Sequence, residues 1–156
     1  MLVVADTSPI NYLVLIDQIG ILPRLYNRIL IPPAVVEELK HPAAPKPVRD
    51  WMDALPGWVE VLRPKNTLSL AQLDLGESEA IALATEMRAE VLLIDDQAGR
   101  QEAARRGLRV AGTLAVLDEA DQAGLVDFKL VLARLLQTSF RVSKAVLAEI
   151  NERRSR

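Results

Sequence analysis

Residues 91–94, Val-Leu-Leu-Ile, are apolar at every position, and two acids, Asp95 and Asp96, follow them directly. A strand with one face in water alternates apolar and polar side chains, whereas an unbroken apolar run is typical of a strand buried on both faces. Such strands lie in parallel sheets that carry helices on each side. This run therefore predicts an α/β protein, in which parallel strands are joined by helices.

Short strand-like runs and helix-like stretches alternate along the rest of the chain. The first run ends at Asp6, and Ser8 and Pro9 then suit the cap and the first position of a helix. This alternation predicts a three-layer α/β/α domain with a five-stranded parallel sheet. The length of 156 residues fits a single domain, residues 1–156. We expect strands at residues 2–5, 29–31, 58–62, 91–94 and 108–111, and helices from Ser8 and at residues 34–40, 48–55, 77–88, 97–106, 113–122, 127–136 and 142–153.

The chain has no cysteine, and His41 is its single histidine. Disulfides, thiolate metal sites and cysteine nucleophiles are therefore excluded. Catalytic triads and metal sites with several histidines are excluded as well, unless another chain contributes. Any catalysis must use carboxylates, hydroxyls, amines or a cofactor. His41 lies in a proline-rich loop, where we expect a surface role rather than metal binding.

The sequence begins without a positively charged leader, and no apolar run approaches the roughly 20 residues that span a bilayer. We therefore expect a cytoplasmic protein that makes no contact with membranes. The absence of cysteine agrees with a reducing compartment.

Basic residues gather in two parts of the chain. The net charge of −2 argues against coating of nucleic acid by bulk charge, because phosphate contacts require local Lys and Arg. Two clusters could nevertheless steer phosphate towards the acids. The alternative is that they form solvated helix faces and a frayed terminus. The clusters are Arg100, Arg105, Arg106 and Arg109, and Arg141, Lys144, Arg153, Arg154 and Arg156.

Acidic residues follow the strands at the edge where parallel α/β proteins bind their ligands. In open parallel sheets, ligand sites form beyond the carboxyl ends of the strands. Asp6 follows the first expected strand, and Asp95 and Asp96 follow the fourth. The helices between them carry the remaining acids of interest, which are Glu37, Glu38, Glu77 and Glu79.

Converging carboxylates would repel one another and raise their own pKa values, and a bound cation removes that conflict. Hard divalent cations take oxygen ligands, and Mg²⁺ usually binds one or two carboxylates together with waters and substrate phosphate. Such a cation can lower the pKa of a bound water and orient it towards a phosphodiester. The acids therefore indicate metal-assisted hydrolysis, which needs no histidine or cysteine.

Each acid also has a structural interpretation. Asp6 could only cap a helix, Glu37 and Glu38 could form a solvated helix face, and Glu77 could complement a helix dipole. Asp95 and Asp96 are harder to explain in this way, because two acids that end a buried strand bear a desolvation cost.

At these acids the sequence resembles the PIN-like superfamily, and more closely its DUF3368 branch, which is related to VapC-type toxin ribonucleases. The order and spacing of the matching segments agree over residues 2–120, which would form the core, followed by C-terminal helices at residues 125–153. The segments are residues 4–9, 31–39, 75–84, 92–96 and 107–114.

The resemblance implies a catalytic and metal-binding set. The first acid of the family corresponds to Asp6, the helix-borne Glu to Glu38, and the fourth acid to Asp96. Thr7 and Ser8 stand where hydroxyls could hold a metal-bound water.

The third acid of the family, usually Asp, corresponds best to Glu77, with Glu79 as second choice. Asp95 is expected to join the metal ligands. The resemblance also implies Mg²⁺ or Mn²⁺ as cofactor, a strand order of 3-2-1-4-5, a homodimer and an antitoxin partner. It implies RNA cleavage that leaves a 3′-hydroxyl and a 5′-phosphate.

Two other enzyme classes fit less well. A phospho-receiver domain needs a Lys after its last strand, where residues 111–114 read Ala-Gly-Thr-Leu. A haloacid-dehalogenase-like phosphatase needs an acid two residues after Asp6, where Ser8 stands. A PIN-like module that binds nucleic acid or protein without turnover stays open, because it shares the acids. The prediction is a metal-dependent ribonuclease, the toxin of a toxin–antitoxin pair.

Overall fold

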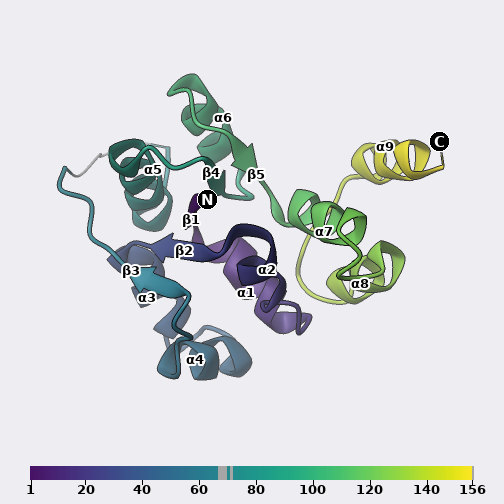
Figure 1. Ribbon diagram of the computed structural model, residues 1–156, viewed down its shortest axis with the longest axis horizontal. Helices are drawn as coiled ribbons and strands as arrows, with labels where there is room; N and C mark the ends of the chain where they lie inside the picture. Colours follow the sequence, from purple (N-terminus) through teal and green to yellow (C-terminus); the bar gives the residue numbers. More distant parts are fainter. Residues whose placement is uncertain (67–69, 71, 156) are drawn as a thin grey trace.

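Five parallel strands form one sheet in the order β3-β2-β1-β4-β5 in the computed structural model, which describes residues 1–66, 70 and 72–155 (Figure 1). The predicted five-stranded parallel sheet and its 3-2-1-4-5 order are therefore confirmed. The strands are β1 (Leu2–Ala5), β2 (Arg28–Ile31), β3 (Val59–Val61), β4 (Val91–Leu93) and β5 (Val110–Ala111).

Helices connect the strands and continue beyond the last of them. None of the helices in the described part of the chain is long and apolar enough to cross a membrane. The helices are α1 (Thr7–Leu15), α2 (Ile21–Tyr26), α3 (Pro33–Lys40), α4 (Lys46–Asp53), α5 (Leu75–Met87), α6 (Gln97–Arg105), α7 (Thr113–Gln122), α8 (Phe128–Leu135) and α9 (Lys144–Arg154).

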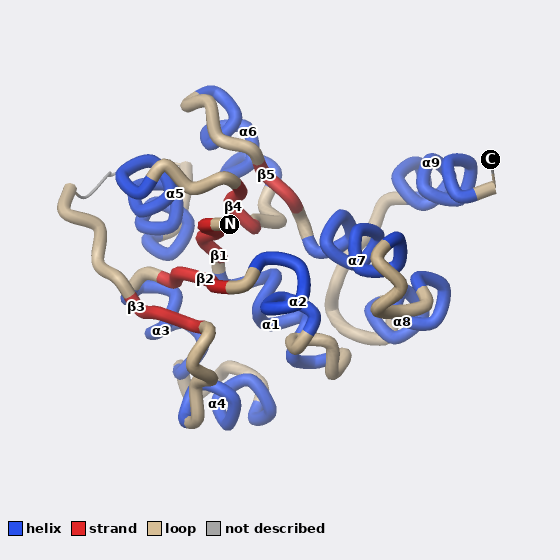
Figure 2. Tube along the Cα trace, viewed as in Figure 1, coloured by secondary structure: helices blue, strands red, loops and turns tan. Residues whose placement is uncertain are grey.

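The core lies on both faces of the sheet, with α5 and α6 on one side and α1 and α2 on the other (Figure 2). Successive side chains of a strand point to opposite faces. Val3 and Leu93 therefore join one apolar cluster, whereas Val4 and Leu92 join the other. All four side chains are fully buried, which explains why β1 and β4 are apolar at every position.

The parallel register places the carboxyl ends of β1 and β4 side by side. Ala5 pairs with Leu93 across the two strands. The backbone N–H of Asp6 continues the ladder by donating to the carbonyl oxygen of Leu93 at 2.9 Å. The chain therefore leaves the first and fourth strands at neighbouring points, and the acids that follow each strand start close together.

Several element boundaries differ from the sequence prediction. The first helix begins at Thr7 rather than after a Ser8 cap, so Asp6 occupies the N-cap position. Helix α4 begins at Lys46, within the stretch predicted as loop, because a proline is tolerated in the first turn of a helix. The six-residue α2 was not predicted, because a helix of fewer than two turns is too short to show a periodic pattern of apolar residues.

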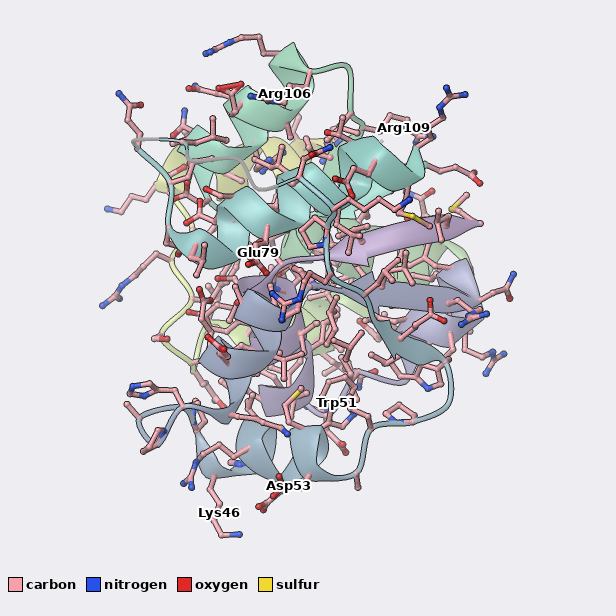
Figure 3. The ribbon with its side chains drawn as sticks, turned by 90° about the vertical axis from the view of Figure 1, so that its left-hand side faces the viewer. Lys46, Trp51, Asp53, Glu79, Arg106 and Arg109 are labelled. Carbon is pink, nitrogen blue, oxygen red and sulfur yellow. The ribbon has the colours of Figure 1, made fainter. Side chains whose placement is uncertain are left out.

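The segment with α4 is anchored by the two tryptophans of the chain. Trp51, labelled in Figure 3 between α4 and the rest of the protein, packs against Trp58 with ring centroids 6.1 Å apart. The other labelled residues of α4, Lys46 and Asp53, extend into solvent (Figure 3).

Candidate metal centre

Asp6 connects β1 to α1 and is almost completely buried, with 5% of its surface exposed. It stands at the N-cap position, yet its side chain makes no capping hydrogen bond. Its Oδ1 atom is buried without a hydrogen-bond partner in the described part of the chain. A buried carboxylate oxygen with no donor is costly. The capping interpretation of Asp6 therefore fails, and the unpaired oxygen indicates a ligand function.

Glu38 reaches this position from α3. Its Oε2 atom accepts a hydrogen bond from the Thr7 hydroxyl, and the backbone N–H of Gly76 also bonds to its carboxylate. A Cβ atom at Gly76 would lie 2.5 Å from Glu38 Oε1, so a larger residue at this position would displace the Glu38 carboxylate. The hydroxyl of Thr7, which was predicted to hold a metal-bound water, donates a hydrogen bond to Glu38 in this structure. Glu37 on the same helix is exposed.

The two acids of α5 point to different neighbours. Glu77 Oε2 is buried without a hydrogen-bond partner among the described residues. A Cβ atom added to Gly99 would lie 3.0 Å from Glu77 Oε2, which shows that Glu77 extends to the first turn of α6. Glu79, labelled in Figure 3, instead accepts a hydrogen bond from the backbone N–H of Ala34 at 2.9 Å. Glu79 thus ties α5 to the first turn of α3.

Asp74 is an acid of the site that the sequence analysis missed. It caps α5 by accepting the backbone N–H of Glu77 at 2.8 Å. Its negative charge raises the pKa values of Asp6, Glu38 and Glu77, so it lies near all three. The signal was present in the sequence, because Asp three residues before Glu is a capping-box pattern.

The adjacent acids after β4 have different environments. Both carboxylate oxygens of Asp95 bind Thr113 at 2.7 Å, one through the backbone N–H and the other through the hydroxyl. Asp95 therefore fixes the start of α7. Asp96 is exposed and caps α6 by accepting the Gly99 N–H at 2.9 Å. One Asp96 oxygen is engaged in that cap, while its carboxylate also interacts with Glu77.

Burial and mutual repulsion shift the ionisation of these groups. Burial raises the pKa of Asp6 from 3.8 to about 7, and the charges of Asp74 and Glu38 add to this shift. Burial likewise raises the pKa of Glu77 to about 9, and interactions with the nearby carboxylates of Asp74 and Asp96 add to this shift. Burial also raises the pKa values of Glu38 and Asp95. A cluster of this kind holds protons at neutral pH unless a cation replaces them.

The donor set fits a hard divalent cation that keeps much of its water. Within the residues that the structure describes, no three acidic side chains are placed so as to enclose one ion together. Mg²⁺ does not need such a cage, because it is usually held by one or two carboxylates with waters and substrate phosphate. The unpaired oxygens of Asp6 and Glu77 are ligands of the required kind.

The fold is that of a PIN domain. A family model described as DUF3368, a PIN domain, matches residues 2–156. The chain therefore belongs to the DUF3368 family of PIN domains, and proteins of the PIN domain family are generally nucleases.

A solved structure supports the same fold. The chain is similar to a PilT N-terminus domain protein from the hyperthermophilic archaeon Sulfolobus solfataricus P2, with 19% identity and a TM-score of 0.51. The match covers 92% of this chain and 100% of the other. A search of curated proteins found no match.

The buried Asp6 carboxyl predicts a specific pH dependence of stability in chelator. Its pKa is about 7 in the folded chain and 3.8 ordinarily, so the folded state holds the proton more tightly. Its contribution to stability is complete below pH 4 and is lost as the pH rises through 7. Asp6→Asn should therefore raise the melting temperature at pH 8 by at least a few degrees, since 1 kcal/mol corresponds to about 2–4 °C for a chain of this size. The difference should disappear near pH 4.

The control for this measurement is Asp53→Asn, which neutralises an exposed acid of α4. Its melting curve should follow that of the parent at both pH values. A lower melting temperature for Asp6→Asn at pH 8 in chelator would show that the Asp6 carboxylate is stabilised by groups within the protein.

Proposed function

We propose that the chain is an Mg²⁺- or Mn²⁺-dependent endoribonuclease. The main support is the buried, unpaired Oδ1 atom of Asp6, which lies where the negative charges of Glu38, Asp74 and Asp95 meet. No folded protein gains stability from such an arrangement by itself. A divalent cation would convert this unfavourable site into a favourable one, which is why we assign the site to metal binding.

The residues that would hold the cation, directly or through its water molecules, are Asp6, Glu38, Glu77 and Asp96, with Asp95 next to them. When bound, the cation would lower the pKa of a water molecule and offset the charge that develops on the phosphate. The water oxygen would form the new bond to phosphorus as the bond to the ribose 3′ oxygen breaks, and that oxygen would leave as a hydroxyl by taking up a proton equivalent to one that the water loses.

The surrounding residues prepare this site before any ligand arrives. Thr7 fixes the Glu38 carboxylate, and Asp74 fixes the first turn of α5, from which Glu77 extends. Because these groups are already ordered, metal binding requires little rearrangement of the protein. It does require the release of the protons that Asp6 and Glu77 hold at neutral pH.

Replacement of Asp6 tests the proposed nuclease. Incubation of the purified chain with mixed cellular RNAs and Mn²⁺ should produce fragments, and chelator should prevent this. Asp6→Asn should reduce the cleavage rate by about a hundredfold or more, because it removes a ligand of the metal that activates the water. Asp53→Asn, an exposed acid outside the site, should cut at the parental rate.

The proposal fails if the parent protein cuts none of these RNAs, or if Asp6→Asn cuts as fast as the parent. Binding of RNA without cleavage, at the same acidic site, would instead favour the alternative function, a PIN-like nucleic-acid-binding module.

Matched glutamines distinguish the two candidates for the third acid. Glu77→Gln replaces a carboxylate whose own Oε2 atom has no hydrogen-bond partner among the described residues, so cleavage should fall at least tenfold and the Mn²⁺ concentration required should rise. Glu79→Gln keeps an oxygen that can accept the N–H of Ala34, so its cleavage rate should stay within about threefold of the parent. The reverse ranking of the two variants would assign the third acid to Glu79.

We further propose that this nuclease is the toxin of a toxin–antitoxin pair and that it acts as a homodimer. The support is the family resemblance of the acidic centre, which is shared with VapC-type toxins. Induced expression in a bacterial host should arrest growth, whereas equal expression of Asp6→Asn should not. Normal growth at an expression level that gives measurable nuclease activity in extracts would argue against the toxin function and leave the nuclease standing.

A further inference from the structure

A cleft of about 970 Å³ opens next to the acidic centre. This volume is near the upper end of the range of about 300–1,000 Å³ that is usual for ligand pockets. One side is formed by residues that follow β4 and β5, among them Asp95, Asp96 and Gly112. The other side is formed by residues 139–143 and by α9, which stands apart from the sheet beyond α7 (Figure 1).

The basic residues of the chain divide into those that stabilise the fold and those that line this cleft. Arg105 and Arg106 pair with Glu102 on their own helix, each at 3.3 Å. Arg154 pairs with Asp118 and Asp121 and covers the ring of Phe128, so it holds α9 against α7 and α8.

Arg109 interacts electrostatically with Tyr26, and Arg156 lies outside the described residues. Lys144 is exposed at the start of α9 and is not among the residues that line the cleft.

Arg100, Arg141 and Arg153 line the cleft and are exposed. Arg100 faces Asp95, and its positive charge opposes the rise in the Asp95 pKa that burial causes. Within residues 1–66, 70 and 72–155, the side chains of Arg141 and Arg153 take part in no ion pair and no hydrogen bond. Their charges are therefore available to an anionic ligand.

Four acidic residues also line the cleft, and most of them are bound by other groups of the protein; they are Asp95, Asp96, Asp118 and Glu149. Asp118 shares the charge of Arg154 with Asp121, Asp95 is bound to Thr113 and faces Arg100, and Asp96 caps α6. Within the described part of the chain, this leaves Glu149 as the acid of the cleft lining that forms no ion pair.

An aromatic surface adjoins the arginines. Phe140 lines the cleft between the body and α9 and packs edge-on against Tyr12, with ring centroids 5.0 Å apart. Both rings are only partly buried. Arginines that follow a phosphate backbone, together with aromatic rings on which bases rest, are the features by which proteins bind single-stranded nucleic acid.

We propose that this cleft binds a single-stranded RNA segment next to the cleaved phosphate, with Arg141 and Arg153 contacting its phosphates. This inference rests on the proposed ribonuclease function, because the acidic centre lies in the wall of the cleft. A single strand fits better than a duplex, because its unstacked bases can reach Phe140, whereas the bases of a duplex are turned inward.

Binding in chelator tests this proposal without requiring cleavage. The probe is a fluorescein-labelled oligouridine of 12 nucleotides, followed by fluorescence anisotropy at several salt concentrations. The double variant Arg141→Gln/Arg153→Gln should bind about tenfold more weakly at low salt. The slope of log affinity against log salt should fall by about 1.4, since each phosphate contact to a single strand contributes roughly 0.7.

Two control variants accompany it. Arg105→Gln/Arg106→Gln removes the same charge from exposed residues at the end of α6 that do not line the cleft, and it should change the affinity less than about twofold. Arg141→Lys/Arg153→Lys retains the charge and should retain the parental salt slope. Agreement of both controls with these values supports RNA binding in the cleft. The melting temperature of each variant confirms that it is folded.

Three results would overturn the proposal. They are absence of binding by the parent chain at low salt, equal loss of affinity in the Arg105/Arg106 variant, and equally tight binding of a duplex of the same length. These results are independent of the nuclease assay. If the chain cuts RNA but the double variant binds it as tightly as the parent, the proposed function holds and this inference fails. If the chain binds RNA through Arg141 and Arg153 but does not cut it, this inference holds and the proposed nuclease function fails.

Discussion

The burial of carboxylates at the carboxyl edge of the sheet is the constraint on which the rest of this structure depends. Parallel pairing of β1 with β4 brings the residues after both strands to the same edge. Once Asp6 is buried there, each neighbouring acid raises the free energy of ionising it. The fold therefore maintains a site that is unfavourable without a cation, and such sites are typically functional rather than stabilising.

Hydrogen bonds around the site hold it together against this repulsion. Thr7 and Gly76 bind the Glu38 carboxylate, so the helix that carries Glu38 is joined to both the first and the fifth helix. Glu79 adds a second connection by accepting the N–H of Ala34. These bonds are formed by backbone groups and hydroxyls, which do not compete with a cation for the unpaired oxygens of Asp6 and Glu77. The unpaired oxygens of Asp6 and Glu77 are thus left free of these bonds, whereas the carboxylate of Glu38 takes part in them.

The C-terminal segment forms the second side of the cleft at the carboxyl edge of the sheet. Helix α9 is mostly exposed, with Ile150 as its buried side chain. Arg154 holds this helix through two aspartates and the Phe128 ring. The same helix presents Arg153 to the cleft, so adjacent arginines have different environments. Arg154 forms ion pairs with Asp118 and Asp121, whereas Arg153 is available to a ligand.

The amino-acid sequence by itself determined the layered α/β fold, because the period of apolar residues is a local property and parallel strands admit few connections. It also placed Asp6 and Asp96 at one edge, since both directly follow strands. The side chains of Glu77 and Glu79 diverge because residues two apart lie on different faces of a helix. Sequence alone could not decide which of the two faces the site.

Only the tertiary structure decided the partners of these groups. It brought Asp74 to the acidic centre, joined Thr7 to Glu38 across 31 positions of sequence, and bound Asp95 to Thr113. It also determined which arginines form ion pairs within the protein and which line the cleft. These outcomes depend on distances between segments that are remote in the chain, and no local pattern of residues encodes such distances.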